Sequence, residues 1–168
     1  MTSQGVHRCF EAVLELPLVK QAQCVRLAAE ASVQVWRQWC RTRHVDDLSP
    51  TLLECFARWQ KGKATDEELN EIAERLGSSL PADIREEKHP AGAYAGYALV
   101  DIAMIALGKC DEVHHSLLHT AIYYAASAYC GIGAEAVWVS LDRLTEPELQ
   151  FLGNWWRQCR EQFAELGA

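Results

Sequence analysis

The stretch AGAYAGYALVDIAMIAL at residues 91–107 decides the fold that this sequence predicts. It is the most apolar part of the chain, and small residues recur in it at the spacing of one helix face. These small residues are Ala91, Gly92, Ala95 and Gly96. A bilayer span needs about 20 strongly apolar residues, whereas this stretch is shorter, is rich in Ala and Gly and contains Asp101. We therefore predict a core helix from about residue 90 to residue 107 and no membrane span.

A second alanine-rich segment follows and is predicted as a helix from about Asp111 to Tyr129. Its small residues are Ala121, Ala125, Ala126 and Ala128. Small side chains let two helix axes approach closely, at the low end of the ~8–10 Å range of packed helices. We therefore expect the two segments to form a central helix pair, with the other helices wrapped around it.

Helix caps rather than strand turns punctuate the rest of the chain. Thr65 with Glu68, and Thr145 with Glu148, have the spacing of capping boxes, and no hairpin signal is present. Further helices are predicted over residues 6–16, 18–43, 49–59, 65–77, 134–141 and 145–166, with a short helix and a loop between 78 and 90. The sequence thus predicts an all-α, irregular multi-helix bundle of about eight or nine helices. We expect a single domain over residues 1–168, with residues 78–90 as a candidate internal joint.

The negative net charge of the chain argues against a nucleic-acid partner. The formal net charge is −7, and duplex nucleic acid is held mainly by Lys and Arg side chains on its phosphates. Basic residues cluster once, at Arg37, Arg41, Arg43 and His44. Such a cluster is typical of a helix C-terminus, where cations oppose the helix dipole. We therefore expect no nucleic-acid partner.

Seven cysteines are scattered along the chain without a CxxC pair, which argues against a zinc ribbon or a redox motif. Most of them lie among apolar residues, where a free thiol behaves as a small buried hydrophobe. The first residues contain no basic segment followed by an apolar run, so we expect no signal peptide. Free thiols in this number indicate a reducing compartment, and we expect the cytoplasm.

The sharpest candidate for chemistry lies at residues 111–119. Asp111, His115 and His119 are spaced by four, so a helix places them in one stripe. Two histidines at this spacing can share a divalent metal ion, and Glu112 could add an oxygen ligand or act as a base. A catalytic zinc needs three protein ligands, and no second helix offers a matching pair. The alternative is structural, with acids in a first helical turn and hydrogen-bonded histidines in the core.

Polar and aromatic residues of the central pair allow two interpretations. Asp101, inside an apolar helix, must find a partner or become neutral, and such groups sometimes mark active sites. Five tyrosines fall on the same two segments: Tyr94, Tyr97, Tyr123, Tyr124 and Tyr129. They could line a ligand pocket, or they could pack in the core with their hydroxyl groups bonded at its edge.

Trp155 and Trp156 are candidates for binding a partner. Adjacent residues of a helix point about 100° apart, so both rings cannot face inward. The outward ring would suit a binding site, since Trp is favoured at interaction hot spots. A second packing layer within the same chain explains the pair equally well.

The segment LECFARWQKGKATDEEL at residues 53–69 resembles bacterial immunity proteins of polymorphic toxin systems. It is also similar to uncharacterised alanine-rich helical proteins of planctomycete type. In both groups a helix with Glu, Trp, a basic residue and Gly precedes a Thr or Ser cap, and Glu54, Trp59, Lys61 and Gly62 match this outline. The resemblance implies a non-catalytic, immunity-like role and transfers no catalytic residue.

Three hypotheses about function follow. The preferred one is a non-enzymatic, cytoplasmic protein-binding domain without a cofactor, whose acidic surface suits a basic partner such as a nuclease toxin. The chain has no phosphate-binding glycine loop and no GxSxG elbow, which favours this hypothesis over an enzyme. The alternative is a metal-binding bundle, or a metal-dependent enzyme, that uses the histidines of residues 114–119. A third is a small-ligand sensor with a tyrosine-lined cavity.

Overall fold

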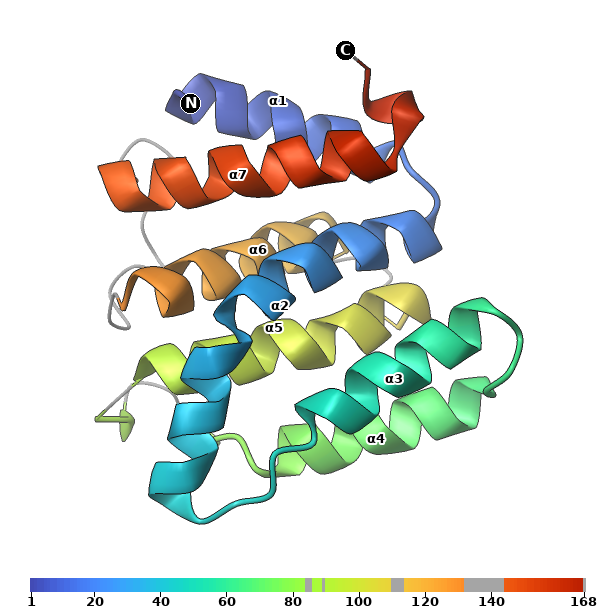
Figure 1. The fold of residues 1–168 in the computed structure, drawn as a ribbon, viewed down its shortest axis with the longest axis vertical. Coiled ribbons are helices and arrows are strands. Elements are labelled where there is room, and N and C mark those ends of the chain that lie inside the picture. Colours follow the sequence, from blue (N-terminus) through green and yellow to red (C-terminus); the bar gives the residue numbers. More distant parts are fainter. Residues whose placement is uncertain (84–85, 89, 110–113, 132–143, 168) are drawn as a thin grey trace.

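The computed structural model describes residues 1–83, 86–88, 90–109, 114–131 and 144–167. Within these ranges the chain forms seven α-helices and no strand, which confirms the all-α class (Figure 1). The helices are α1 (Ser3–Leu14), α2 (Leu18–Arg43), α3 (Ser49–Gln60), α4 (Asp66–Ser78), α5 (Pro90–Ala106), α6 (His114–Cys130) and α7 (Glu146–Gln162). A short 3₁₀ helix, η4 (Ala164–Leu166), follows α7.

Seven helices are fewer than the eight or nine predicted, and two segments account for the difference. A short helix was predicted between 78 and 90, but the described residues 79–83 and 86–88 form no α-helix, and among them Glu86 alone is in 3₁₀ conformation. Pro81 disfavours a helix there because it has no N–H and restricts the residue before it. Its carbonyl oxygen instead accepts a hydrogen bond from the Tyr97 hydroxyl, at 2.7 Å. The helix predicted over residues 134–141 lies outside the described residues.

Both predicted capping boxes are present and fix the starts of α4 and α7. The hydroxyl oxygen of Thr65 accepts a hydrogen bond from the backbone N–H of Glu68 at 3.1 Å. In return, the Glu68 carboxylate accepts one from the backbone N–H of Thr65 at 2.7 Å. Thr145 and Glu148 repeat the arrangement at the start of α7. These boxes satisfy amide groups that an uncapped helix would leave free.

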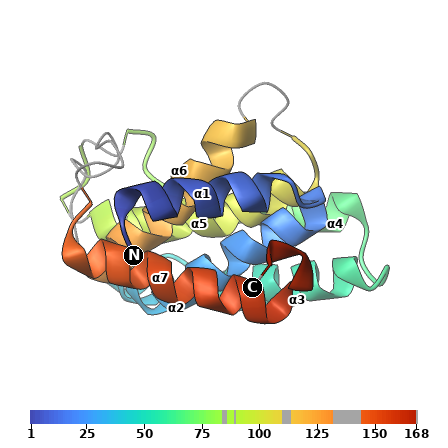
Figure 2. The ribbon, with the colours of Figure 1, turned by 90° about the horizontal axis from the view of Figure 1, so that it is seen from above.

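Helix α5 occupies the centre of the molecule, as its apolar sequence predicts. It packs against both α2 and α6, which also pack against each other, and the view from above places α2 and α7 along the face opposite α6 (Figures 1 and 2). Its packing against α2 is more extensive than its packing against α6. The centre of the bundle is therefore a group of three helices, α2, α5 and α6, rather than the predicted pair.

The glycines of α5 accommodate tryptophans of α2. A Cβ atom added at Gly92 would lie 2.2 Å from Cβ of Trp39, and one added at Gly96 would lie 2.5 Å from the ring of Trp36. Both distances are far below van der Waals contact. The small-residue face of α5 therefore makes room for two indole rings of α2. The prediction that Gly92 and Gly96 bring α5 close to α6 is wrong, because both face α2 instead.

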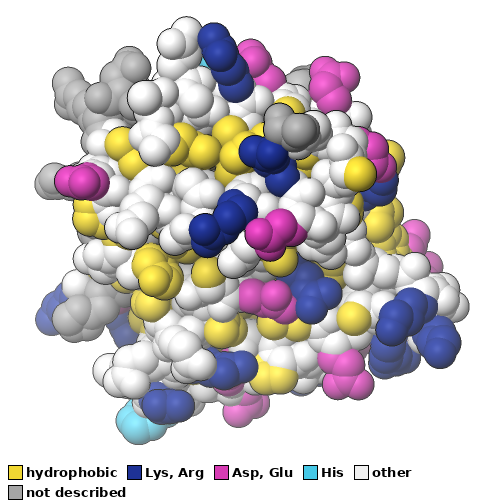
Figure 3. Space-filling model, turned by 45° about the horizontal axis from the view of Figure 1, so that its top comes forward, with side chains coloured by type: hydrophobic (Ala, Val, Ile, Leu, Met, Phe, Trp, Pro, Cys, Tyr) yellow, Lys and Arg dark blue, Asp and Glu magenta, His cyan; other side chains and the backbone are white. Residues whose placement is uncertain are grey.

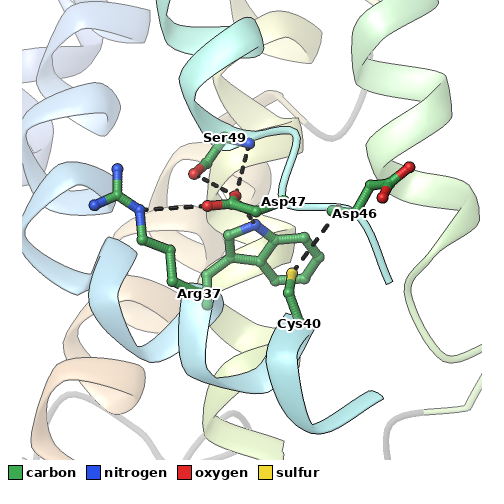
Figure 4. Close-up of polar contacts among 6 residues, drawn as sticks. Arg37, Cys40, Asp46, Asp47 and Ser49 are labelled. Atoms are coloured by element: carbon green, nitrogen blue, oxygen red, sulfur yellow. Dashed lines mark hydrogen bonds and ion pairs between the residues drawn. The ribbon is translucent and has the colours of Figure 1, made fainter. Parts of the chain in front are cut away.

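The carboxylate of Asp47 ties the end of α2 to the start of α3 (Figure 4). One of its oxygens accepts hydrogen bonds from Trp36 Nε1 at 3.0 Å, from the Ser49 backbone N–H at 3.0 Å and from Ser49 Oγ at 2.6 Å. The other pairs with Arg37 Nε at 3.3 Å. Asp47 thus fixes the direction in which the chain leaves α2. The predicted end of this helix is confirmed, since Arg41 and Arg43 lie in its last turn.

The outer helices complete the bundle. Helices α1 and α7 pack against each other at one end of the molecule, and the α3–α4 hairpin packs against α5 at the other (Figure 1). No helix in the described ranges combines the length and the apolarity needed to cross a membrane. On the face that Figure 3 shows, positive and negative side chains are interspersed, and hydrophobic side chains are visible between them.

Candidate functional site

One face of α2 stays at the surface of the described chain, and we call it the open face of α2. It consists of Leu27, Ala31, Gln34, Val35, Gln38 and Thr42, which are all exposed or half-buried. These residues recur every three or four positions, so they form one stripe along the helix. No helix lies in front of α2 in Figure 1. Two clefts border the open face, one beside α5 and one beside α7.

The α2–α5 cleft has a volume of about 510 Å³ and a mainly apolar lining. It is lined by Gln34, Val35, Gln38, Trp39, Thr42, Arg43, Ala91 and Gly92. The Arg43 guanidinium lies over the Trp39 ring, 5.4 Å from its centroid, and forms an ion pair with Glu87. Arg43 is the only charged residue of the described chain that lines either cleft. Its charge is thus already matched by a carboxylate.

Trp39 gives the α2–α5 cleft an indole ring that is 6% exposed and stacks on Trp36 with a centroid distance of 5.2 Å. Its Nε1 atom is buried, and no acceptor for it exists among the described residues. A buried donor without an acceptor costs roughly 1–3 kcal/mol and is uncommon in folded proteins. Gly92 of α5 lies directly against Trp39 and has no side chain that would fill the cleft.

The α2–α7 cleft has a volume of about 290 Å³ and is lined, within the described chain, by uncharged residues alone. They are Leu27, Ala31, Tyr129, Pro147, Gln150, Phe151, Asn154, Trp155 and Gln158. Tyr129, at the end of α6, is 59% exposed, and its ring lies 5.1 Å from that of Phe151. An aromatic side chain held at the surface beside apolar neighbours is a feature of binding sites.

The two predicted partner-binding tryptophans occupy different environments. Trp155 is 3% exposed, its Nε1 donates a hydrogen bond to the carbonyl oxygen of Cys24 at 2.8 Å, and its ring lies 5.7 Å from that of Phe10. It is therefore a core residue that also lines the α2–α7 cleft. Trp156 is half-buried against the core and lines neither cleft. The two rings lie 6.3 Å apart, and a role of the pair in binding a partner stays a prediction.

Asp101 and three tyrosines form a cluster between α5 and α6, in which Asp101 and Tyr94 are buried and Tyr97 and Tyr124 are half-buried. The Tyr124 ring stacks on those of Tyr94 and Tyr97, with centroid distances of 5.1 and 5.4 Å. Asp101 is 8% exposed, and within the described chain it has no hydrogen-bond or ion-pair partner. Burial raises the pKa of its carboxyl group to about 8. Asp101 is thus mostly uncharged at neutral pH.

The tyrosines of this cluster stack on one another and line neither cleft. The Tyr94 hydroxyl is fully buried without a hydrogen-bond partner in the described chain, and burial raises the pKa of Tyr94 to about 12. Burial raises the pKa of Tyr124 to about 12 as well. Lining a ligand pocket was one of two interpretations of the five tyrosines, and among them Tyr129 lines one of the two clefts.

The predicted metal ligands are only partly described. The ring of His119 lies 4.6 Å from that of Phe10, so this histidine packs against α1. Asp111 and Glu112 lie outside the described residues, as does the side chain of His115. In the rest of the chain, no three residues among His, Cys, Asp and Glu are placed to hold a metal ion. The metal site stays a prediction.

Six of the seven cysteines are described, and all six are free thiols. Five of them are buried: Cys9, Cys24, Cys40, Cys55 and Cys159. Burial raises the pKa of the Cys9 thiol to about 11 and that of Cys40 to about 12. A thiol with a raised pKa is a poor nucleophile, so the cysteines act as core residues, as the sequence predicts.

The segment at residues 53–69 forms most of the α3–α4 hairpin, and its distinctive residues have local structural roles. Trp59 Nε1 donates a hydrogen bond to Asp66 in the first turn of α4, at 2.6 Å. Gly62 has a φ of +67°, which favours glycine. Comparison of the chain with protein-family models, curated proteins and solved structures found no match. The resemblance to immunity proteins therefore stays a prediction.

Proposed function

We propose that this chain is a non-enzymatic domain that binds another protein through the open face of α2 and its two clefts. The observation that carries the proposal is the lining of these clefts, which combines aromatic residues with almost no charge. The cores of protein–protein interfaces are depleted of charged residues and enriched in Trp and Tyr. Trp39 and Tyr129 supply such residues, one in each cleft.

The contrast with the rest of the chain supports the proposal. Charged residues make up 23% of the sequence, yet Arg43 is the one charged residue in the described lining of the clefts. Long charged side chains are costly to bury in an interface, whereas they keep a free surface soluble. Their scarcity in the lining of the two clefts therefore favours a surface that becomes covered.

We place the partner among bacterial toxins, because residues 53–69 resemble immunity proteins. The net charge of −7 suits a basic toxin, since complementary charge accelerates the encounter of two proteins. The clefts would then supply the short-range contacts that hold the complex together. Cytoplasmic location and the absence of a cofactor are parts of the same proposal.

A pair of matched substitutions tests the binding surface. Val35→Glu puts a charge into the α2–α5 cleft, and Val19→Glu makes the same change on α2 outside both clefts, at an exposed valine. The binding protein is the product of the adjacent gene, or a protein captured from the native cell and then purified. In calorimetric titrations we expect Val35→Glu to weaken binding at least tenfold, by burying an unpaired charge. Val19→Glu should leave the affinity unchanged.

Equal effects of the two substitutions would contradict the proposed surface. For a toxin partner, growth of a cell that produces the toxin gives a second readout. Co-expression of the wild-type chain or of Val19→Glu should restore growth, and co-expression of Val35→Glu should not.

A further inference from the structure

Carboxamide side chains are concentrated around the two clefts. The sequence contains eleven Gln and Asn residues, and five of them line one cleft or the other. The five are Gln34, Gln38, Gln150, Asn154 and Gln158. The last three are spaced by four along α7, so they form one row beside the α2–α7 cleft.

The row on α7 has unused hydrogen-bonding capacity. Gln150 and Gln158 are exposed, and neither has a hydrogen bond within the described chain. The side-chain oxygen of Asn154 accepts a hydrogen bond from Arg157 at 3.1 Å, which leaves its two N–H groups unused. A carboxamide offers two donors and an acceptor, which is the chemistry of the peptide group itself. The row is therefore suited to a polypeptide backbone.

The spacing of the row favours an extended backbone over a helical one. Residues four apart on a helix are separated by about 6 Å along its axis, since each residue rises 1.5 Å. Alternate residues of an extended chain recur every ~6.6–6.8 Å. Three amides on α7 thus stay nearly in step with an extended chain. A helical segment would offer few unpaired groups, because its backbone bonds are made internally.

The remaining lining selects an uncharged and partly apolar segment. Leu27 and Ala31 of α2 form one side of the cleft, and Phe151 and Tyr129 add aromatic surface. No charged residue of the described chain lines this cleft, so a charged side chain placed there would lose its hydration without gaining a counter-ion.

We propose that the α2–α7 cleft binds an extended, uncharged segment of a partner protein. Gln150, Asn154 and Gln158 hydrogen-bond to its backbone, and its apolar side chains rest on Phe151 and Tyr129. This inference depends on the proposed protein-binding function and adds the conformation and the chemistry of what is bound.

The probe is a library of random linear twelve-residue peptides, displayed on phage and selected on the purified full-length chain. We expect the selected peptides to share an uncharged core with apolar residues at alternate positions and to tolerate proline, which helices exclude. In nuclear magnetic resonance titrations, the tightest peptide should shift the side-chain amide signals of Gln150, Asn154 and Gln158. Amphipathic helical peptides that shift only α2–α5 residues would overturn this inference and leave the protein-binding function standing.

Two matched variants test the row itself. Gln158 lines the cleft, and Gln162 is an exposed glutamine one turn further along α7 that does not line it. Gln158→Leu should weaken the selected peptide about fivefold, which is typical of one lost hydrogen bond. Gln162→Leu should leave the affinity unchanged, and thermal melts should show both variants folded. Equal affinities of the two variants, or failure of the library to yield any binding peptide, would overturn the inference. The proposed function is judged separately, by Val35→Glu and Val19→Glu.

Discussion

Among single residues, Asp101 stands out as a buried carboxyl group in an apolar helix. It is buried on α5 beside stacked tyrosines, and its carboxyl group has a pKa of about 8. In the unfolded chain the same group ionises near pH 4. Unfolding therefore releases a proton at any pH between about 4 and 8. The free energy of unfolding falls as the pH rises through this window, and above it Asp101 adds nothing further to the pH dependence.

The substitution Asp101→Asn isolates this effect. The amide has the shape of the acid and stays neutral, so the variant should lose the contribution of Asp101 to the pH dependence. From pH 5 to pH 8, urea denaturation should show wild-type stability falling by several kcal/mol more than that of the variant, at roughly 1.4 kcal/mol per pKa unit. At pH 8 the variant should be the more stable protein. Parallel curves would mean that Asp101 is ionised in the folded state.

At the scale of helices, the packing of α5 against α2 depends on glycine, and Gly92→Ala tests it. The added methyl group would overlap Trp39, and overpacking of this kind typically costs about 1–3 kcal/mol. Gly77→Ala is the matched control, because a Cβ there meets its nearest neighbour at 3.8 Å. Thermal denaturation should show Gly92→Ala destabilised and Gly77→Ala unchanged or stabilised, since alanine favours a helix. Equal melting temperatures would contradict the observed packing.

The elements themselves could be predicted from the sequence because their signals are local. The apolarity of residues 91–107 indicates α5, and the boxes at Thr65 and Thr145 mark the starts of α4 and α7. The neighbour of a small residue could not be predicted in this way. Gly92 and Gly96 indicate a close approach, but the sequence does not say whether a helix backbone or an indole ring makes it.

At the scale of the whole molecule, the candidate site is formed by segments distant in sequence. One cleft lies between α2 and α5 and the other between α2 and α7. No local pattern in the sequence predicts which helices lie side by side. Trp155 was predicted at a binding site, and it lines one cleft while its ring is held in the core. A usable signal was present on α7, where Gln150, Asn154 and Gln158 stand in a row in which charged residues would be expected.

The proposed binding surface can be tested most directly by hydroxyl-radical footprinting of the chain, free and bound to its partner. Tyr129 is exposed in a cleft, and Leu18 is an exposed residue at the start of α2 outside both clefts. We expect binding to slow the oxidation of Tyr129 severalfold and to leave that of Leu18 unchanged, because a partner on the open face excludes water from the clefts. Protection confined to the α3–α4 hairpin, with Tyr129 still reactive, would show that the open face of α2 is not the binding surface.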